Sequence, residues 1–176
     1  FLNDYYLKKF RNKRRNNNNI TIISSIVSRK DLIKLAIVLS IYFPNKEIIY
    51  KLRPEEYNSW KSIYPESLIS LNNVKFVADE NKELYRNLYE SDFVIGTNST
   101  VLLQSIPFSK VIIIKSGWYK EFYPLIEHGF IKFAKNNNEV IKIILGDKNK
   151  IIKSGKTLYK PNFTSNIKKF IKLLNI

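Results

Sequence analysis

The segment from Ser91 to Lys115, SDFVIGTNSTVLLQSIPFSKVIIIK, constrains the fold of this chain more than any other segment. An apolar β-type run at 93–95 is broken by a polar turn, Gly96-Thr97-Asn98. A stretch of helical spacing opens at Ser99, and a second apolar run, 111–114, follows it. Strand, turn, helix and strand in this order form a βαβ unit, which predicts a parallel sheet with helices packed on it.

The turn inside this unit is a candidate anion site, because it joins the carboxyl end of a strand to the start of a helix. Free backbone N–H groups and the positive end of the helix dipole favour an anion there. The hydroxyls of Ser99 and Thr100 can add hydrogen bonds to a phosphate. Capping of the helix by Asn98 or Ser99 explains the same residues without a ligand. Capping alone, and capping combined with phosphate binding by Gly96, Thr97, Asn98, Ser99 and Thr100, both fit the sequence.

The rest of the chain repeats the alternation of strand and helix. Further strands are expected at Ile20–Ile26, Glu47–Leu52, Val74–Val77 and Phe130–Ala134, and helices at 31–42, 55–63, 82–89, 120–127, 138–145 and 166–174. Five or six strands alternating with helices predict an α/β fold with an open, doubly wound parallel sheet. Ligands of such sheets bind at the carboxyl ends of the strands. Neither GxGxxG nor GxxxxGK[ST] is present, so a dinucleotide fingerprint and a P-loop lack support.

A second candidate anion site follows the expected strand 47–52. Lys51 and Arg53 stand two positions apart at its end, and Pro54 and Glu55 follow. The alternation of a strand places Lys51 and Arg53 on the same side, and Pro54 fixes the exit of the chain. Two cations at a strand end suit a diphosphate or a sugar carboxylate. Solvated basic residues at a strand terminus would give the same sequence pattern. Only the neighbouring turn that contains Asn98, Ser99 and Thr100, which we call the NST turn, favours the binding interpretation.

The loop after the first expected strand adds candidate contacts to a phosphate or an acceptor. These candidates are Ser24, Ser25, Ser28 and Arg29. Ordinary loop composition explains them equally well.

Length and composition limit the alternatives. The 176 residues suffice for one well-packed domain, which we place at 20–176 after a basic linker or arm at 1–19. Cysteine is absent and histidine occurs once, so disulfides, thiolate sites and multi-histidine metal centres are excluded. The chain contains no methionine and begins with Phe1, so we expect it to be a piece of a longer protein.

The net charge of +15 favours an anionic partner, such as a nucleotide, an anionic polymer, a membrane surface or nucleic acid. The abundance of Lys, Asn and Ile is also typical of an AT-rich genome, which would leave part of the charge on a solvated surface. The longest apolar stretch, 32–43, is shorter than a membrane span and contains Lys34. Six positive charges between Lys8 and Arg15 either bind anionic lipid or form a solvated linker.

Three pieces of the sequence together resemble one enzyme family. They are IIYKLRPEE, NVKFVADENKELYRNLYESDFVIGTNSTVLLQSIPFSKVIII, and a helix that runs into LIEHGF. In this order they resemble the C-terminal domain of GT-B-type glycosyltransferases of bacterial surface polysaccharides. The likeness is to sialyltransferases and polysialyltransferases, capsule synthesis proteins and CDP-glycerol transferases, and it covers about 20–145.

The resemblance implies a Rossmann-like half of a GT-B fold, in which Ser99 and Thr100 hold the phosphate of a nucleotide donor and the Lys51–Pro54 turn contacts the nucleotide. Arg53 stands where the family commonly has His. Because Arg does not release its proton, it can replace only the electrostatic role of that His. The catalytic base of such enzymes lies in an N-terminal domain that this chain lacks, so no catalytic residue is assigned.

We therefore expect the donor-binding part of a glycosyltransferase that moves a sugar from a CMP- or UDP-sugar to a bacterial surface glycan or glycolipid. It would work in the cytoplasm, at the inner face of the membrane, without cofactor or metal, because the cations meet the developing phosphate charge. Two other classes remain open. A nucleic-acid-binding module would show a pronounced salt dependence, although no nucleic-acid motif is present. A sugar-nucleotide 2-epimerase would need carboxylates and a histidine at the site.

Overall fold

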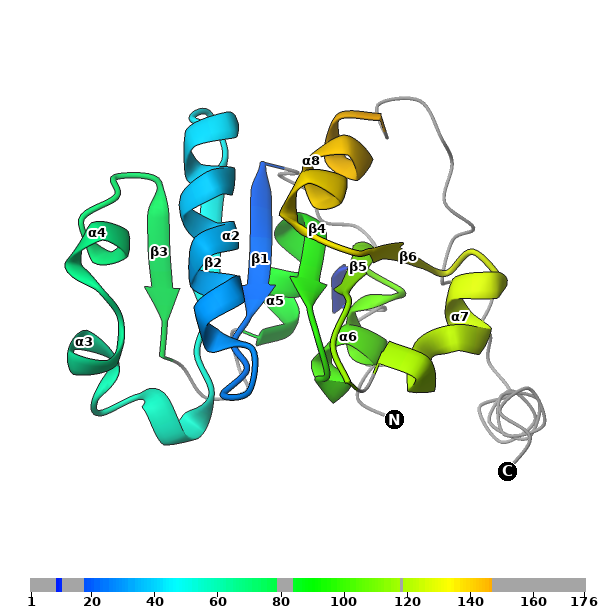
Figure 1. Ribbon diagram of the computed structural model, residues 1–176, viewed down its shortest axis with the longest axis horizontal. Coiled ribbons are helices and arrows are strands. Elements are labelled where there is room, and N and C mark those ends of the chain that lie inside the picture. The colour runs from blue at the N-terminus through cyan, green and yellow to red at the C-terminus, as the bar shows by residue number, and fades with distance from the viewer. Residues whose placement is uncertain (1–8, 11–17, 79–83, 118, 147–176) are drawn as a thin grey trace.

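The computed structural model describes residues 9–10, 18–78, 84–117 and 119–146. Its centre is a parallel sheet of six strands in the order β3-β2-β1-β4-β5-β6 (Figure 1). The strands are β1 (Asn19–Ile23), β2 (Glu47–Lys51), β3 (Val74–Val77), β4 (Ser91–Gly96), β5 (Lys110–Ile114) and β6 (Ile131–Ala134). This arrangement confirms the predicted α/β class and the open, doubly wound sheet.

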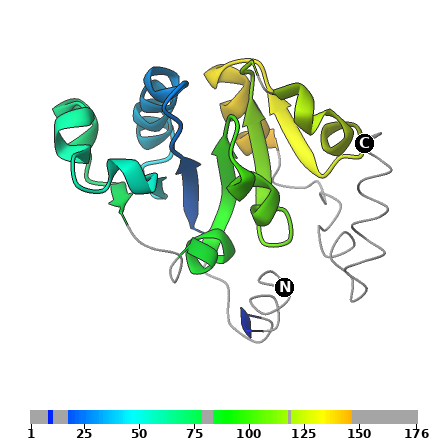
Figure 2. The same cartoon turned by 90° about the horizontal axis from the view of Figure 1, so that it is seen from below.

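Helices cover both faces of the sheet (Figure 2). The α-helices are α2 (Arg29–Tyr42), α3 (Trp60–Ile63), α4 (Glu66–Ile69), α5 (Leu84–Glu90), α6 (Thr100–Ser105), α7 (Tyr123–Glu127) and α8 (Asn137–Gly146), and η1 (Pro54–Glu56) and η2 (Tyr119–Phe122) are 3-10 turns. One apolar core lies between the sheet and α2, α4 and α8. The other lies between the sheet and α5, α6 and α7. Two separate cores follow from a sheet that is buried on both faces.

Burial on both faces explains why the strands could be predicted accurately. Along β5 the even-numbered Ile112 and Ile114 belong to one core, whereas Val111 and Ile113 belong to the other. Such strands are continuous apolar runs, which are easy to see in a sequence. The long helix α2 buries the stripe Leu32, Leu35, Ala36 and Leu39, all of them fully buried at the spacing expected for one helical face.

The switch point in strand order lies between β1 and β4. Ile22 pairs with Tyr50 of β2 on one side and with Ile95 of β4 on the other. From β1 the chain proceeds outward to β2, and from β4 it proceeds in the opposite direction to β5. The loops that follow β1 and β4 therefore diverge to opposite faces, which leaves room for a ligand at the carboxyl ends of these strands.

Several element boundaries differ from the predictions. The strand expected at 20–26 ends at Ile23, because the chain turns at Ser24 and Ser25 to start α2. The helix expected at 55–63 is wrong, because η1 and α3 are separate short turns and residues 57–59 lie between them. The helix α4 was not predicted. Gly129, which follows the C-cap residue of α7, has a φ of 75°, the left-handed conformation that glycine adopts readily after a helix. The helix expected at 166–174 lies outside the described residues.

Most of the basic segment 1–19 lies outside the described residues, but Phe10 does not. Its ring is buried and stacks on Tyr89 at a centroid distance of 4.8 Å. Phe10 is thus part of the second core and is not available for insertion into a lipid surface. Asn19, expected in the linker, is the first residue of β1. None of the helices among the described residues combines the length and the apolar character that a membrane crossing needs.

Candidate functional site

Two loops meet at the switch point and are tied together by one side chain. Asn98, in the turn after β4, accepts hydrogen bonds at Oδ1 from Ser25 Oγ at 3.0 Å and from Thr97 Oγ1 at 2.9 Å. Ser25 follows β1 and is buried, as is Thr97. These three residues form a partition at the carboxyl edge of the sheet. Asn98 lines a large cleft, and Thr97 lines a smaller cavity.

The start of α6 is built as the sequence predicts. Ser99 is the N-cap, and its Oγ accepts a hydrogen bond from the backbone N–H of Val101 at 3.2 Å. Gly96 ends β4 beneath it, where an added Cβ would lie 3.1 Å from Cδ2 of Leu102. The helix therefore packs close to the strand end. Because α6 has only six residues, its dipole is small, and cationic side chains must supply most of the charge for an anion.

The large cleft has a volume of about 810 Å³. It brings together the ends of β1, β2 and β4 with the start of α6. Its lining is Ile23, Ser24, Lys51, Leu52, Arg53, Pro54, Tyr57, Leu84, Asn98, Ser99, Thr100 and Val101. The two motifs singled out in the sequence, the NST turn and the turn after Lys51, thus face one cleft. Its size falls in the range of small-molecule sites.

The two cations of the large cleft are held differently. Lys51 is only 6% exposed, and its Nζ donates to Tyr57 Oη at 2.8 Å and lies 4.9 Å from the centre of that ring. The side chain of Arg53 is 42% exposed and forms a fork with the carboxylate of Glu55 at 3.3 and 3.4 Å. The Arg53 hydrogen bond lowers the pKa of Glu55. A phosphate entering the cleft would compete with Glu55 for Arg53.

A buried carboxylate, Glu56, supports the floor of this region. Its side chain is 2% exposed and pairs with Arg29 at 3.1 Å. Glu56 also accepts from Tyr64 Oη at 2.9 Å and from the backbone N–H of Arg53 at 3.0 Å. A hydrogen bond of 2.9 Å joins Tyr64 to Ser24. The network links the loop after β1 to the turn after β2, so it fixes the position of two walls of the cleft.

The pKa values of Glu56 and Tyr64 are set by their burial and their hydrogen bonds. Burial alone would raise the pKa of Glu56, but the hydrogen bonds from Arg53, Tyr64 and Arg29 outweigh it and hold that pKa below 4.5. Burial raises the pKa of Tyr64 to about 12. Glu56 is therefore charged and Tyr64 is neutral at pH 7, which suits a carboxylate that accepts and a phenol that donates.

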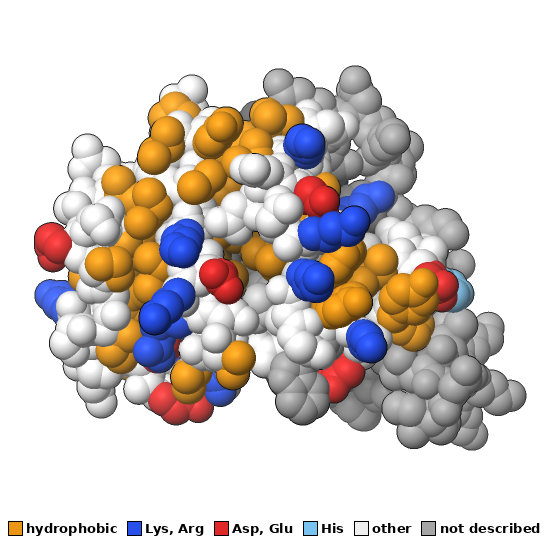
Figure 3. Space-filling model, in the orientation of Figure 1, with side chains coloured by type: hydrophobic (Ala, Val, Ile, Leu, Met, Phe, Trp, Pro, Cys, Tyr) orange, Lys and Arg blue, Asp and Glu red, His pale blue; other side chains and the backbone are white. Residues whose placement is uncertain are grey.

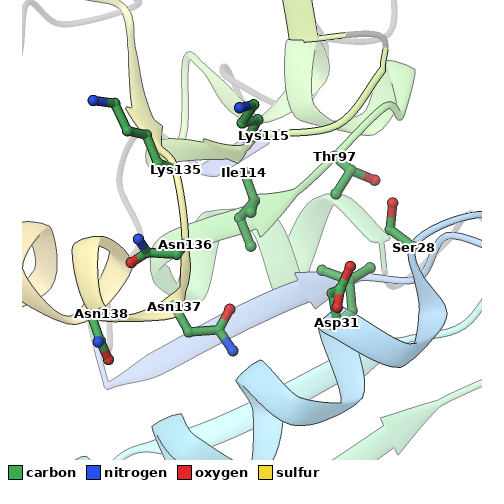
Figure 4. A pocket seen from close by; sticks show the side chains of 10 residues that line it. Ser28, Asp31, Thr97, Ile114, Lys115, Lys135, Asn136, Asn137 and Asn138 are labelled. Carbon is green, nitrogen blue, oxygen red and sulfur yellow. The ribbon is translucent and has the colours of Figure 1, made fainter.

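The smaller cavity, of about 370 Å³, lies between the starts of α2 and α8. Its lining is Ser28, Asp31, Leu32, Thr97, Ile114, Lys115, Lys135, Asn136, Asn137 and Asn138, and we call it the amide cavity. In Figure 4, Asn137 points toward Asp31 across the space, and Ile114 points into it. Lys115 and Lys135 extend upward in the same view, on the side away from Asp31.

Most predicted site residues thus converge on the switch point, but not on one cavity. Ser24, Lys51, Arg53, Pro54, Asn98, Ser99 and Thr100 line the large cleft, whereas Thr97 and Ser28 line the amide cavity. Ser25 belongs to the partition, and Gly96 packs beneath α6. Arg29 pairs with Glu56, and Glu55 pairs with Arg53.

Sequence reasoning missed three features of the site. Glu56 has no local signal that separates it from the exposed Glu55, apart from its place three residues after the N-cap Arg53. Tyr57 falls within the predicted helix 55–63, which does not form, so its place in the lining of the large cleft was not predicted. The run Asn136-Asn137-Asn138 directly follows β6 and opens α8. A polar run at that position of a parallel sheet is a signal that could have found the amide cavity.

Solved structures share this fold. A UDP-GlcNAc 2-epimerase from Neisseria meningitidis, bound to UDP-GlcNAc, superposes with a TM-score of 0.56 at 14% identity, over 98% of this chain and 43% of the epimerase. The C-terminal CMP-Kdo binding domain of WaaA from Acinetobacter baumannii superposes with a TM-score of 0.52 at 11% identity, over 99% of this chain and 97% of that domain. The C-terminal domain of LpcC, a glycosyl transferase group 1 family protein from Francisella tularensis, superposes with a TM-score of 0.57 at 15% identity, over 90% of this chain and 92% of that domain.

These likenesses show the fold. This chain spans less than half of the epimerase but nearly the full length of the two C-terminal domains. The Rossmann-like α/β domain of the sequence prediction is thereby confirmed. No protein-family model and no curated protein sequence matches the chain.

Proposed function

We propose that this chain is the donor-binding part of a glycosyltransferase and that the large cleft binds the nucleotide of an activated sugar. The observation that carries the proposal is the convergence of Ser24, Lys51, Arg53, Ser99 and Thr100 on one cleft at the switch point. Hydroxyl donors and two cations around a cavity of this size suit a phosphate with an attached nucleoside. Two fold neighbours, one named for CMP-Kdo binding and one as a glycosyl transferase, support the same class. The neighbour named as a UDP-GlcNAc 2-epimerase supports only the binding of a nucleotide sugar.

In this proposal Ser99 and Thr100 donate hydrogen bonds to the phosphate. Lys51 and Arg53 stabilise the negative charge that develops when the nucleotide leaves, so no metal ion is needed. Arg53 acts through its charge and its fork of donors, because it does not release a proton. The sugar would pass to a bacterial surface glycan or glycolipid, such as a capsule polysaccharide or a lipooligosaccharide. The catalytic base would come from an N-terminal domain, as the resemblance implies.

Epimerase chemistry has less support in the large cleft. Moving a proton on a sugar ring calls for carboxylates or a histidine at the site. Among the described lining residues of the large cleft there is no Asp, Glu or His. The described His128 is the C-cap residue of α7, and its Nδ1 lies 2.9 Å from the carbonyl oxygen of Pro124.

Nucleic-acid binding also has less support. On the face seen in Figure 3, Lys and Arg side chains lie in small separate groups with acidic side chains among them, rather than in one continuous stripe. A basic stripe is the usual footprint of a nucleic-acid surface. Described aromatic side chains such as Tyr50, Tyr64 and Phe93 are buried in the core and cannot stack on bases.

Calorimetric titration tests the proposal. The chain is titrated with CMP, UMP, CDP and UDP, each with EDTA and again with Mg²⁺, and separately with a DNA duplex at two salt concentrations. We expect saturable, one-to-one binding of at least one nucleotide, with equal affinity in EDTA and Mg²⁺. If none of the nucleotides binds and the DNA duplex binds with an affinity that falls steeply with salt, the chain is a nucleic-acid-binding module and the proposal is wrong.

Membrane association is proposed from charge alone. The segment 8–15 carries six positive charges, and each basic residue near an anionic leaflet contributes about 1 kcal/mol. The burial of Phe10 removes one apolar neighbour from this attraction. Sedimentation with anionic vesicles should therefore fall strongly with added salt. Sedimentation that does not change when the six residues are replaced by Gln would favour a solvated linker.

A further inference from the structure

The amide cavity combines two lysines with groups that do not suit an anion. Lys115 and Lys135 line it but extend away from Asp31 (Figure 4). Its amide side chains each present donors and an acceptor, Asp31 presents acceptors, and Ser28 and Thr97 present hydroxyls. A phosphate only accepts hydrogen bonds at neutral pH, so the carboxylate of Asp31 would repel it. A sugar hydroxyl both donates and accepts. It can therefore satisfy an amide and a carboxylate in the same cavity.

The helix starts beside the cavity do not call for an anion either. Asp31 lies in the first turn of α2 and Glu139 in the first turn of α8, where each offsets its helix dipole. Glu139 also accepts from the backbone N–H of Lys135 at 2.7 Å, and its own N–H donates to Asn136 Oδ1 at 3.1 Å. Asn136 thus has a capping role. Asn137 is half-buried and points across the cavity (Figure 4).

The floor of the cavity is apolar. Leu32 and Ile114 line it, and both are buried. A pyranose ring combines hydroxyls around its rim with an apolar face of C–H groups, so polar walls over an apolar floor match it. The volume of about 370 Å³ lies in the range of small-ligand sites.

The position of the cavity links it to the large cleft. Thr97 lines the amide cavity, Asn98 lines the large cleft, and the hydrogen bond between them belongs to the partition. A phosphate bound at Ser99 would lie two residues from Thr97, so the group that it carries would lie near the amide cavity. We infer that the amide cavity holds the sugar ring of the donor, with Asn137 and Asp31 as the residues that select its hydroxyl pattern. This inference rests on the proposed function.

The test compares nucleotides with and without their sugar. Kd is measured by calorimetry for UDP against UDP-GlcNAc and for CMP against CMP-N-acetylneuraminate, using the full chain and three variants. Asn137→Leu keeps the size of the side chain but removes its hydrogen bonds. Asp31→Asn keeps its shape and removes the charge. Asn72→Leu is the matched control, since Asn72 is exposed and lies before β3 at the opposite edge of the sheet.

For at least one pair we expect the sugar to add affinity to the wild type. Asn137→Leu should lose about tenfold in affinity for that nucleotide sugar while binding of the bare nucleotide stays unchanged, which corresponds to about 1.4 kcal/mol. Asp31→Asn should lose part of the affinity that the sugar adds, and Asn72→Leu should lose none of it. The inference is overturned, with the proposed function intact, if nucleotides bind but the sugar adds nothing or its increment survives in Asn137→Leu. If the wild type binds no nucleotide or nucleotide sugar at all, the proposed function fails and the inference fails with it.

Discussion

The large cleft and the amide cavity are lined by adjacent residues, Asn98 and Thr97, yet they are built in different ways. The walls of the large cleft are fixed by a buried network around Glu56, and its cations, Lys51 and Arg53, come from one short turn. The amide cavity takes its polar groups from the starts of α2 and α8 and from residues that follow β4, β5 and β6, and several of them are exposed. Rigid charge suits a group that every donor shares, which is the phosphate. Adaptable amides suit the part that differs between donors, which is the sugar.

The strongest way to break this comparison is to remove the hydroxyls at the start of α6. In the variant Ser99→Ala/Thr100→Ala, nucleotide affinity should fall by about 100-fold or more, because each hydrogen bond to a charged group contributes about 1.5–3 kcal/mol. Loss of the Ser99 cap should cost about 1 kcal/mol of unfolding free energy. Calorimetry and urea unfolding measure the two effects. Unchanged nucleotide affinity in the folded variant would place the site elsewhere.

The second effect concerns the network behind the large cleft. Glu56→Gln should lower the free energy of unfolding by about 2–3 kcal/mol, because the buried network loses its charged acceptor and the half-buried Arg29 loses its charged partner. Glu55→Gln is the matched control, since Glu55 is exposed, and its stability should change little. Urea unfolding at pH 7 gives both values. Equal stability of the two variants would show that the network does not hold the cleft walls.

The same variant makes a prediction about pH. The pKa of Glu56 is lower in the folded protein than its ordinary value of 4.5, so its contribution is complete above that value and is lost as the pH falls through the folded pKa. The stability difference between wild type and Glu56→Gln should therefore narrow below about pH 4.5. Urea unfolding across this pH range measures it. A difference that widens in acid would have the wrong sign for this account.

A smaller effect is expected at the strand end beneath α6. Gly96→Ala places a Cβ 3.1 Å from Leu102 Cδ2, so the buried Leu102 side chain must give by a few tenths of an ångström. Overpacking of this kind should cost about 1–2 kcal/mol of unfolding free energy and weaken nucleotide binding with it. Gly117→Ala is the control, because nothing lies within 4 Å of its added Cβ. Equal thermal unfolding of the two variants would mean that Gly96 does not position the turn.

The smallest effect sharpens the role of Arg53. Arg53→Lys keeps the charge but loses the fork of donors, so nucleotide affinity should fall only about threefold, whereas Arg53→Ala should lose about tenfold or more. Nucleotide titration of the three proteins ranks them. Equal affinity for all three would remove Arg53 from the large cleft.

Much of the large cleft could be predicted from sequence, because its parts are local. The NST turn and the Lys51 turn each follow an apolar run, and the carboxyl ends of parallel strands meet at one edge. Glu56 could not be predicted as buried, since its burial depends on Tyr64 and Arg29, which are distant in sequence. The amide cavity escaped for the same reason. Ser28, Thr97, Lys115 and Asn137 follow four different strands, and only the strand order brings them together.

The most direct test of the central claim is a residue-resolved NMR titration of the labelled chain with the nucleotide that binds best in calorimetry. Our account predicts that the bare nucleotide perturbs backbone amides at 51–53 and 97–101 and leaves Asn136, Asn137 and Asn138 unchanged. The matching nucleotide sugar should perturb both regions. Perturbations that avoid 51–53 and 97–101 altogether would contradict the assignment of the large cleft as the nucleotide site.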